Sequence, residues 1–557
     1  MFALGLGLTT PTLHAQQNVL LIIADDLGVD NVGVYAEHPD PANTPVIDLL
    51  AQDGMLFRSA YADPICTPTR STIFTGRHGY RTLIGTAISQ FSSDGLPAPE
   101  VTLAEALAPS HRTALVGKWH LGNEPLHPMS AGFEHHRGTM GNILSNGSLG
   151  NGYFSFEKST DGVLGLSTTY ATTDTVNDAL DLIADFQGSP WFVTVSFNAA
   201  HKPIHKPPQA LHTYTLPPDE EGNEPIHVQA MIEAMDTEIG RLLASLSPAD
   251  LLNTTIIFVG DNGPASVAVT PPWDPDKVKR TLYEGGVRVP LIVYGPGVQT
   301  GSECKALVNS TDLFATVADL AGAPHETGVD SISLLPYFND PEREPLRAHA
   351  FTERFVPNFS DVADRQLAVR NARFKLIRQE AFGALTPPGE MLFDLEHDPF
   401  EDVDLLQSPL DPEAQASYIE LAAYLDARVI ETPPGPWTRL GGGTVGSAGG
   451  PRLEGLGTLQ PGTIANLRLS AAPPNSLLLM SLSLDVLPAL LAGGGLIANP
   501  PMLQRLFVSD GVGQFEGSIP WPAGFESGTG LWFQFLVADP SVVWGFTLSN
   551  SAKATTP

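Results

Sequence analysis

Short apolar runs bounded by turn residues recur through the first half of the chain. They occupy residues 19–24, 113–116, 191–197, 255–259 and 290–294. Continuous apolar runs of this length are typical of strands covered on both faces, because a strand with one wet face alternates with polar residues. Helical patterns lie between the runs, as at 175–186 and 225–246. This alternation predicts an α/β fold built on a large, mostly parallel sheet between layers of helices.

The pattern changes from about residue 346. Segments 367–370, 374–378 and 391–395 read as antiparallel strands, and a turn at 396–402 and a helix near 411–432 follow them. Local strand pairing of this kind is typical of a small α+β unit. We therefore predict a large α/β domain over residues 16–345 and an antiparallel C-terminal subdomain over 346–432.

The last part of the chain has a third kind of sequence pattern. Residues 433–452 are rich in glycine and proline without apolar periodicity, which predicts a linker. Residues 453–557 hold short alternating runs and many turn residues, so we predict an appended all-β accessory module. Its most apolar run, 476–487, is the expected core strand. No catalytic cluster is visible there, and packing or attachment are the expected roles.

The N-terminus resembles a secretory signal. Residues 2–8 are apolar apart from glycine, and small and polar residues lead to Ala15, the expected cleavage site, although no basic residue precedes the apolar stretch. We expect residues 1–15 to be removed and the protein to be exported to the periplasm or the extracellular space. No other stretch has the length and apolar character of a membrane span.

The charge balance excludes one class of partner. The 557 residues include 61 Asp and Glu against 30 Lys and Arg, a formal net charge of −31. Nucleic acids are bound through a basic face, so no nucleic-acid partner is expected. An anionic substrate would have to enter through a local cationic pocket against the overall field.

Polar residues with metal-binding chemistry follow the apolar runs. Asp25 and Asp26 end the first run, and Asp261 and Asn262 end the fourth. Taken singly, such pairs are most often turns or helix caps. Parallel sheets place ligands beyond the carboxyl ends of their strands, however, and oxygen ligands in this number suit a hard cation such as Ca²⁺ or Mg²⁺.

Residues 66–70 read Cys-Thr-Pro-Thr-Arg and run into Thr75-Gly76-Arg77 at the start of an expected helix. This C-x-P-x-R pattern resembles the signature of the type I, formylglycine-dependent sulfatases of the alkaline phosphatase-like superfamily. Residues 117–122 (GKWHLG), His201 and residues 279–290 (KRTLYEGGVRVP) resemble further sulfatase segments in the family's order. Three positions depart from the family's usual residues: Thr69 for Ser, Ala200 for Pro and Arg280 for Gly.

The resemblance implies a site as well as a fold. Cys66 is converted by a maturation enzyme to formylglycine, whose hydrate attacks sulfur. Ca²⁺, or less expectedly Mg²⁺, is bound by Asp25, Asp26, residue 66, Asp261 and Asn262. The remaining implied catalytic residues are Arg70, which braces the hydrate; Lys118 and Lys279, which neutralise charge; His201 or Lys279, which protonates the leaving oxygen; and His120, which removes a proton. Cys304 is then a structural thiol rather than the disulfide partner of Cys66, the pairing that two cysteines in an exported protein would otherwise indicate.

The substrate is open at this point. Export, acidity and the β-rich module favour a sulfated polysaccharide or its oligosaccharides. Candidate substrate contacts are His205, His136 and Arg137, the last two of which follow residues 131–134. A solvated loop is an equally good interpretation of His136 and Arg137. Two alternatives stand beside sulfate hydrolysis: a phosphodiester or phosphonate monoester hydrolase of the same superfamily, and a non-catalytic carbohydrate-binding protein.

Overall fold

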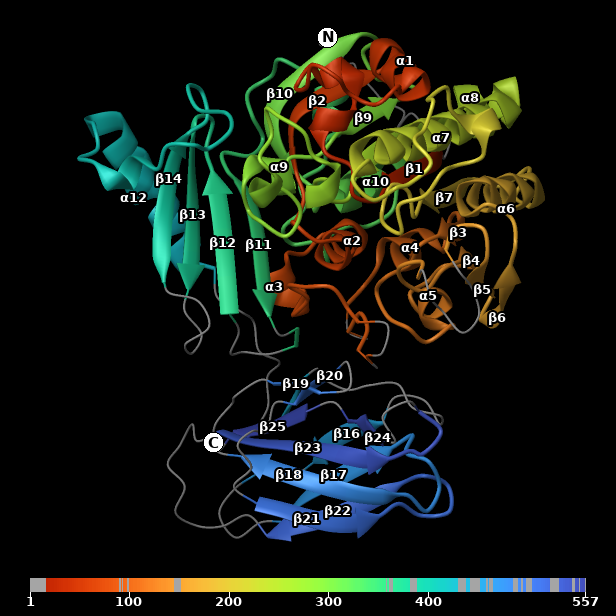
Figure 1. Cartoon of the computed structure of the whole chain (residues 1–557), viewed down its shortest axis with the longest axis vertical. Coiled ribbons are helices and arrows are strands. Elements are labelled where there is room, and N and C mark those ends of the chain that lie inside the picture. Colours follow the sequence, from red (N-terminus) through yellow and green to blue (C-terminus); the bar gives the residue numbers. More distant parts are fainter. Residues whose placement is uncertain are drawn as a thin grey trace, which may run out of the picture.

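The structure is a computed structural model of the whole chain. It describes residues 17–555 apart from 90–91, 93, 98–99, 145–151, 357, 360–363, 381–387, 429–436, 441–450, 457–458, 460–463, 484–488, 492–493, 497–502, 521–529, 543–545 and 550. Figure 1 shows a main body of helices and strands, a smaller sheet at its side and a β-rich module below it. The expected signal segment, residues 1–15, lies outside the described residues.

A ten-stranded sheet forms the centre of the main body. Its strands in spatial order are β10 (Ser302–Asn309), β2 (Met55–Tyr61), β9 (Leu291–Tyr294), β8 (Thr254–Gly260), β1 (Asn18–Ala24), β7 (Trp191–Ser196), β3 (Arg112–Gly117), β4 (His135–Gly138), β5 (Phe156–Thr160) and β6 (Val163–Ser167). Strands β9 and β5 run antiparallel to both of their neighbours, and every other neighbouring pair is parallel. The predicted α/β fold around a mostly parallel sheet is confirmed.

Helices cover both faces of this sheet. One face carries α1 (Pro45–Asp53), α6 (Ala171–Asp185) and α7 (Glu224–Ser245), and the other carries α2 (Cys66–Thr75), α4 (Leu103–Leu107) and α10 (Asp312–Ala321). Shorter helices are α3 (Gly79–Thr82), α5 (His127–Ser130), α8 (Pro248–Leu252), α9 (Glu284–Val287) and α11 (Leu335–Phe338).

Strand β1 shows why a central strand reads as an unbroken apolar run. Leu20 and Ile22 belong to the core under α6 and α7, whereas Leu21 and Ile23 belong to the core under α2 and α10. All seven residues of β1 are buried. Each large side chain buried in this way contributes about 1.5–3 kcal/mol, so both faces select apolar residues.

The smaller sheet is the predicted C-terminal subdomain. It contains β11 (Ala350–Val356), β12 (Asp364–Arg370), β13 (Phe374–Glu380) and β14 (Gly389–Asp394) in antiparallel order, with α12 (Pro412–Asp426) across β12 and β13. Lys375 Nζ reaches from β13 into the main body, 2.9 Å from Glu284 Oε1. This buried ion pair fixes the subdomain beside α9.

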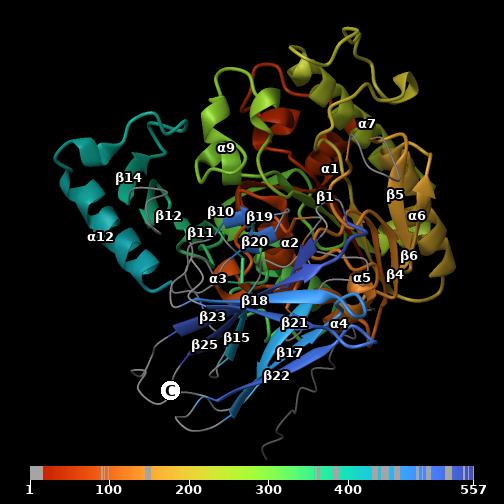
Figure 2. The same cartoon turned by 60° about the horizontal axis from the view of Figure 1, so that its bottom comes forward.

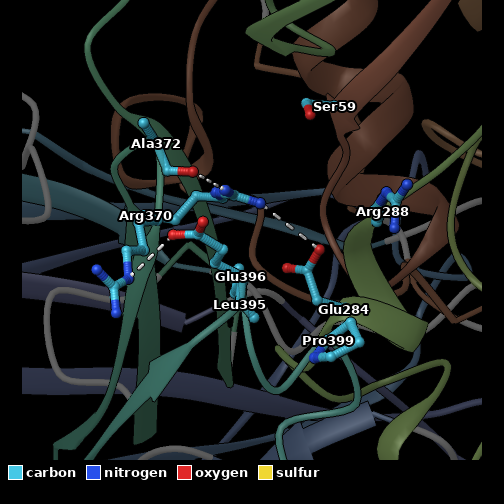
Figure 3. A pocket seen from close by; sticks show the side chains of 9 residues that line it. Ser59, Glu284, Arg288, Arg370, Ala372, Leu395, Glu396 and Pro399 are labelled. Carbon is cyan, nitrogen blue, oxygen red and sulfur yellow. Dashed lines mark hydrogen bonds and ion pairs between the residues drawn. The ribbon is translucent and has the colours of Figure 1, made fainter.

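A cavity of about 300 Å³ lies in the seam between this subdomain and the main body (Figure 3). Arg370 Nη2 donates to the carbonyl oxygen of Ala372 at 2.7 Å, and its Nη1 lies 3.9 Å from Glu284 Oε2. Arg373 Nε lies 3.4 Å from Glu396 Oε2. The guanidinium groups of Arg370 and Arg373 are thus bound by oxygen atoms of the protein. We infer that they stabilise the contact between the subdomain and the main body.

The β-rich module consists of two main sheets and a hairpin. One sheet has the order β15 (Trp437–Leu440), β25 (Ser551–Thr555), β23 (Gly530–Ala538), β18 (Leu477–Ser483) and β21 (Leu503–Val508), with β24 (Phe546–Leu548) beside β23. The other contains β16 (Arg452–Leu456), β17 (Ile464–Ser470) and β22 (Phe515–Pro520), and β19 (Ala489–Leu491) pairs with β20 (Gly494–Leu496). Strand β18 lies in the expected core run, and its Leu478 and Met480 are buried.

The boundary of the module differs from the sequence expectation. Strand β15 lies inside the stretch expected to be a linker, 433–452, and pairs with β25. Residues 437–440 are therefore part of the sheet, which their short length and glycine-rich surroundings concealed. The module lies on the side of α3 and α5 (Figures 1 and 2), where Arg452 of β16 forms an ion pair with Glu124.

Two further expectations from the sequence concern the two cysteines and membrane-spanning helices. Cys66 and Cys304 are both buried and are not joined in a disulfide, as expected. Within the described ranges, none of the helices combines the length and apolar character that a membrane crossing requires.

Candidate functional site

Four adjacent parallel strands end at one edge of the large sheet, and polar side chains follow each of them. Strand β8 is followed by Asp261 and Asn262, β1 by Asp25 and Asp26, β7 by Asn198 and His201, and β3 by Lys118 and His120. The parallel registers of β1 with β7 and β8, and of β3 with β7, bring these segments side by side. The edge thus collects the residues that the sequence singles out.

Two lysines neutralise the carboxylates that follow β1. Lys118 Nζ donates to Asp25 Oδ2 with both side chains fully buried. Lys279 Nζ donates to Asp26 Oδ1, which also accepts a hydrogen bond from Asn262 Nδ2 at 2.9 Å. Burial lowers the pKa of Lys279, but the charges of Asp26, Cys66, Asp25 and Asp261 together outweigh burial, so the net shift is upward. Lys279 therefore stays charged.

Arg70 connects the helix α2 to the ends of three strands. Its Nε and Nη2 donate to Asp261 Oδ2 at 3.1 and 2.9 Å, and its Nη1 donates to the carbonyl oxygen of Lys118 at 2.8 Å. The hydroxyl of Ser196, the last residue of β7, lies at hydrogen-bond distance from the same Nη1. Arg70 is thus a positioning residue for the carboxylate cluster. Ser196 was missed in the sequence because it looks like the end of an apolar strand.

Cys66 lies where these groups converge. It is the first residue of α2, and only 2% of its surface is exposed. Its Sγ and carboxylate oxygens of Asp25 and Asp261 lie within 4.8 Å of one another. Burial raises the pKa of the Cys66 thiol, so the unmodified side chain is a neutral thiol here.

The donor set fits a metal ion. Asp25 Oδ1 and Asn262 Oδ1 are buried acceptor atoms with no hydrogen-bond partner among the described residues. Burial, followed by the charge of Asp25, raises the pKa of Asp261 to about 7. Buried acceptors without donors are costly unless a cation binds them, and carboxylate and amide oxygens are the ligands of hard cations. The cluster therefore has the composition of a Ca²⁺ or Mg²⁺ site.

His120 is held beside this cluster by an unusual backbone. Gly117, which ends β3, has φ +89, and a Cβ atom there would lie 2.0 Å from the carbonyl oxygen of Ser196. His120 itself is left-handed (φ 60), and its N–H donates to the carbonyl oxygen of Met140 at 2.9 Å. Left-handed backbone is unfavourable for a residue with a Cβ and is often kept at functional sites. Burial, followed by Lys118 and Arg70, lowers the pKa of His120 well below its usual value, which leaves a neutral imidazole.

His201 faces the same cluster from the end of β7. Its Nδ1 lies 2.8 Å from the carbonyl oxygen of Lys202, so Nδ1 carries the hydrogen and Nε2 remains available. Burial lowers the pKa of His201, although Asp26 and Asp25 act in the opposite direction. The hydroxyl of Tyr153 lies 2.5 and 2.7 Å from the carbonyl oxygens of Asn198 and His201 and fixes this loop. No motif or pattern in the sequence indicated Tyr153.

His205 belongs to an aromatic group beside His201. Its ring centroid lies 4.2 Å from that of Tyr153, and its Nε2 lies 3.1 Å from the hydroxyl of Tyr170. Phe154 packs on Tyr170 with ring centroids 5.1 Å apart and keeps 46% of its surface exposed. The group is a hydrophobic wall with one open aromatic face.

The structure does not bring His136 and Arg137 to this cluster. Both lie in strand β4, so the expectation of a loop at these positions is wrong. His136 is fully buried, and Arg137 Nη1 lies 3.8 Å from Asp178 of α6. Strand pairing with β3 turns the two side chains to opposite faces of the sheet, which a sequence cannot show without knowledge of that pairing.

Arg280, which stands where the resemblance expects glycine, has φ 74. The chain therefore keeps a left-handed turn after Lys279 without glycine, at a steric cost of about 1 kcal/mol. The N–H of Arg280 donates to the carbonyl oxygen of Pro64 at 2.8 Å, and this bond holds the turn next to the Cys66 segment.

Comparisons with known proteins bear on this geometry. The family model "Sulfatase" matches residues 17–323, and the model "N-sulphoglucosamine sulphohydrolase, C-terminal" matches residues 276–427. Arylsulfatase A of Homo sapiens is 30% identical over 490 residues, covering 77% of this chain and 91% of that protein. N-acetylgalactosamine-6-sulfatase of Sus scrofa is 31% identical over 371 residues, covering 60% of this chain and 68% of that protein.

Solved structures share the fold. The crystal structure of Ps i-CgsB in complex with k-i-k-neocarrahexaose superposes with a TM-score of 0.62 at 24% identity, over 74% of this chain and 92% of that one. The structure of BT4656 in complex with its substrate D-glucosamine-2-N,6-O-disulfate gives a TM-score of 0.58 at 19% identity, over 74% and 97%. The family model spans all the polar residues that follow β8, β1, β7 and β3, which we call the strand-end cluster, and the relatives align over most of their length. The chain therefore belongs to the sulfatase family.

Proposed function

We propose that this protein hydrolyses sulfate esters of a carbohydrate, using a formylglycine made from Cys66. The observation that carries the proposal is the convergence of Cys66 Sγ with carboxylate oxygens of Asp25 and Asp261 within 4.8 Å, at the start of a helix and at the ends of parallel strands. A thiol with a raised pKa is a poor nucleophile. The need for a different nucleophile at this position supports conversion of the residue.

The cation is held by Asp25, Asp26, Asp261 and Asn262 together with residue 66, and we propose Ca²⁺ because the ligands are flexible oxygen donors. When bound, the cation supplies Lewis-acid polarisation of a sulfate oxygen. Three carboxylates, Asp25, Asp26 and Asp261, face the three cationic groups of Arg70, Lys118 and Lys279. This balance suits a site that takes up a cation and an anion together.

Formylglycine supplies a hydrated aldehyde as the nucleophile for sulfur. The protein residues around it have separate tasks. Arg70 fixes Asp261 and the end of β3, and Lys118 and Lys279 present fixed positive charge to the transferring group, where preorganised charge is most effective. Nδ1 of His120 has no hydrogen-bond partner among the described residues and can take up a proton in the site. Lys279 Nζ can give a proton to the leaving oxygen, and His201 Nε2 can do so only after it has itself taken up a proton.

The substrate class is inferred from relatives and from the surroundings of the site. The relatives include an N-acetylgalactosamine-6-sulfatase, and structural neighbours are complexed with a neocarrahexaose and with a disulfated glucosamine. His205 and the exposed ring of Phe154 offer a flat apolar face beside His201, as sugar rings require. We do not keep His136 and Arg137 as substrate contacts, because one is buried and the other is paired with α6.

The domain organisation and location complete the proposal. Residues 1–15 act as a signal for export, 16–345 form the catalytic domain, 346–432 the C-terminal subdomain and 453–557 an accessory module. The separate antiparallel sheet β11–β14 and the separate core of the module support this division. A maturation enzyme acting on Cys66 is the required partner.

Two measurements test the function. The mass of the peptide spanning Cys66, from protein made in its native host, should show formylglycine. The matured protein should then release sulfate from a panel of sulfated mono- and oligosaccharides, and it should not cleave matched phosphodiesters to an alcohol and a phosphate monoester. Cleavage of the phosphodiesters in preference to the sulfate esters would favour the phosphodiesterase alternative, and sugar binding without turnover by matured protein would favour the binding protein.

A further inference from the structure

A second cavity, of about 250 Å³, lies beside the strand-end cluster. Three segments line it: residues 200–204 after β7, residues 220–228 at the start of α7, and residues 265–267 after β8. None of these segments takes part in the metal site itself. The cavity is therefore a neighbour of the reacting centre and not a part of it.

Two of its walls are continuous with the site. The N–H of Ala200 donates to the carbonyl oxygen of Asp25 at 2.7 Å, and Lys202 directly follows His201. On the other side, Ala265 follows Pro264, whose carbonyl oxygen accepts a hydrogen bond from the N–H of Lys279 at 3.2 Å. A group attached to a sulfate bound between Lys279 and His201 would find this cavity next to it.

The lining combines apolar and acidic side chains. Ile204, Val228 and Val267 contribute apolar surface, which suits the C–H face of a ring. Glu220, Glu221 and Glu224 contribute three carboxylates, against one lysine, Lys202.

The single Lys202 of the lining does not offset these three carboxylates. In the described part of the chain, no hydrogen bond or ion pair is formed by the side chains of Glu220, Glu221 and Glu224, in contrast to the paired Asp25 and Asp26 of the neighbouring site. Carboxylates accept hydrogen bonds from sugar hydroxyls and repel anions. The cavity thus has the opposite charge preference to the sulfate site beside it.

We propose that this cavity receives the sugar that carries the scissile sulfate, and that Glu220, Glu221 and Glu224 restrict this sugar to one without a second anionic group on the side of α7. Monosulfated sugars with free hydroxyls are accepted, and sugars with an additional sulfate or carboxylate there are rejected. This inference rests on the proposed sulfatase function and specifies its substrate class. Selection by repulsion at a rim is a common route to specificity.

A purely structural role of the glutamates makes a different prediction. Acidic residues near the first turn of a helix stabilise it through the helix dipole, and Glu224 is the first residue of α7. In that case their replacement would lower the melting midpoint without changing the choice of substrate.

The test uses matured full-length protein at 0.15 M salt, where charges beyond about 8 Å are screened. Three substrates are compared: the monosulfated sugar that the panel identifies as the best, its disulfated counterpart, and 4-nitrophenyl sulfate, which has no sugar. For the wild type we expect kcat/KM to be about tenfold higher for the monosulfated sugar than for the disulfated one, the ratio that 1.4 kcal/mol produces.

The triple variant Glu220→Gln, Glu221→Gln, Glu224→Gln should lose most of this preference and hydrolyse 4-nitrophenyl sulfate as the wild type does. Asp219→Asn is the matched control, because it removes one charge from the same turn at a residue outside the lining. It should keep the preference.

Several outcomes would overturn the inference. They are an unchanged preference in the triple variant, an equal effect of Asp219→Asn, a wild-type preference for the disulfated sugar, and turnover of the aryl sulfate alone. If the matured protein releases sulfate from none of the three substrates, the proposed function fails, and this result differs from all of those outcomes.

Discussion

Arg70 Nη2 lies 2.9 Å from Asp261 Oδ2, and neither side chain has any exposed surface. The pair joins the first turns of α2 to the end of β8, two segments that are 191 residues apart in the chain. Because Cys66 opens α2 and Asp261 belongs to the carboxylate cluster, this one contact sets the position of residue 66 relative to the donors around it.

Removing the guanidinium should destabilise the protein strongly. Arg70→Met leaves the Asp261 carboxylate buried with its partner gone, and we expect the free energy of unfolding to fall by about 3–5 kcal/mol. Urea unfolding followed by tryptophan fluorescence measures the change. The control is Glu303→Gln, which removes the partly exposed pair with Arg58 (2.6 Å) and should cost below about 1 kcal/mol. Equal costs for the two variants would contradict the role given to Arg70.

Substitutions of Cys66 test the proposed nucleophile. Cys66→Ala should abolish sulfate release and leave the melting midpoint near that of the wild type, because the thiol forms no hydrogen bond among the described residues that would be lost. Cys66→Ser should release at most one equivalent of the sugar alcohol and then stop, since a serine hydroxyl offers no second hydroxyl to expel the sulfate. Repeated turnover by Cys66→Ser, or wild-type activity of Cys66→Ala, would refute the mechanism.

Calcium should stabilise the folded protein measurably. At a concentration one hundred times Kd, a ligand that binds only the folded state contributes about 2.7 kcal/mol. The chelated protein should therefore melt at a lower temperature, and Ca²⁺ should restore the midpoint. In Asp261→Asn this calcium shift should shrink or disappear, whereas Asp340→Asn, at an exposed residue outside the cluster, should keep it. A shift of equal size in both variants would place the calcium elsewhere.

Asp63 contributes stability that should be lost as pH rises from about 5 to 8. Burial, and next the charge of Glu353, raise the pKa of Asp63 to about 8, although the N–H of Glu353 donates to its Oδ1 at 3.0 Å. In the unfolded chain an aspartate has a pKa of about 3.9. At this residue the folded protein thus binds more protons than the unfolded chain across this interval, so raising the pH removes the contribution of Asp63 to the free energy of unfolding.

The variant Asp63→Asn tests this pH dependence. The amide cannot ionise, so the contribution of Asp63 to the slope between pH 5 and 8 should disappear, and the slope that remains should still include the contribution of Glu353, whose pKa is also raised by burial. Urea midpoints across the pH range measure the slope. Equal slopes in the two proteins would show that Asp63 is ionised in the folded state.

Phe154 provides a separate test of the sugar-binding wall. An aromatic contact contributes about 1 kcal/mol, so Phe154→Ala should raise KM for a carbohydrate sulfate about fivefold and leave kcat for 4-nitrophenyl sulfate unchanged. Phe154→Tyr keeps the ring and should behave as the wild type. If the alanine variant loses activity toward both substrates equally, Phe154 supports the fold of the site and not the sugar.

The central strands could be predicted because both of their faces are buried. Strands β1, β3, β7 and β8 appear in the sequence as apolar runs for this reason. Strand β2 was missed because Arg58 and Ser59 interrupt it, and β10, at the edge of the sheet, was missed because Glu303 and Lys305 alternate with buried residues. An apolar run also carries no direction, so the antiparallel course of β9 could not be read from residues 290–294.

The sequence allowed us to predict which residues form the site, but not which of them contact each other. Motif order and strand ends placed Asp25, Asp26, Asp261, Asn262 and Lys118 at one edge of the sheet. The pairing of Lys118 with Asp25 and of Lys279 with Asp26 depends on the order of strands across the sheet, and spacing along the chain does not contain this order. The cavity of the glutamates depends in the same way on where α7 begins relative to β7 and β8.

The burial of Cys66 has a consequence for the history of each molecule. With 2% of its surface exposed, the side chain is out of reach of any other protein's catalytic groups once α2 has packed on the sheet. An enzyme that alters it must act on the chain while it is still extended, before the strands on either side of residue 66 have paired. The fraction of molecules that becomes active would then depend on the rate of modification relative to the rate of folding, and not on the affinity of two folded proteins for each other.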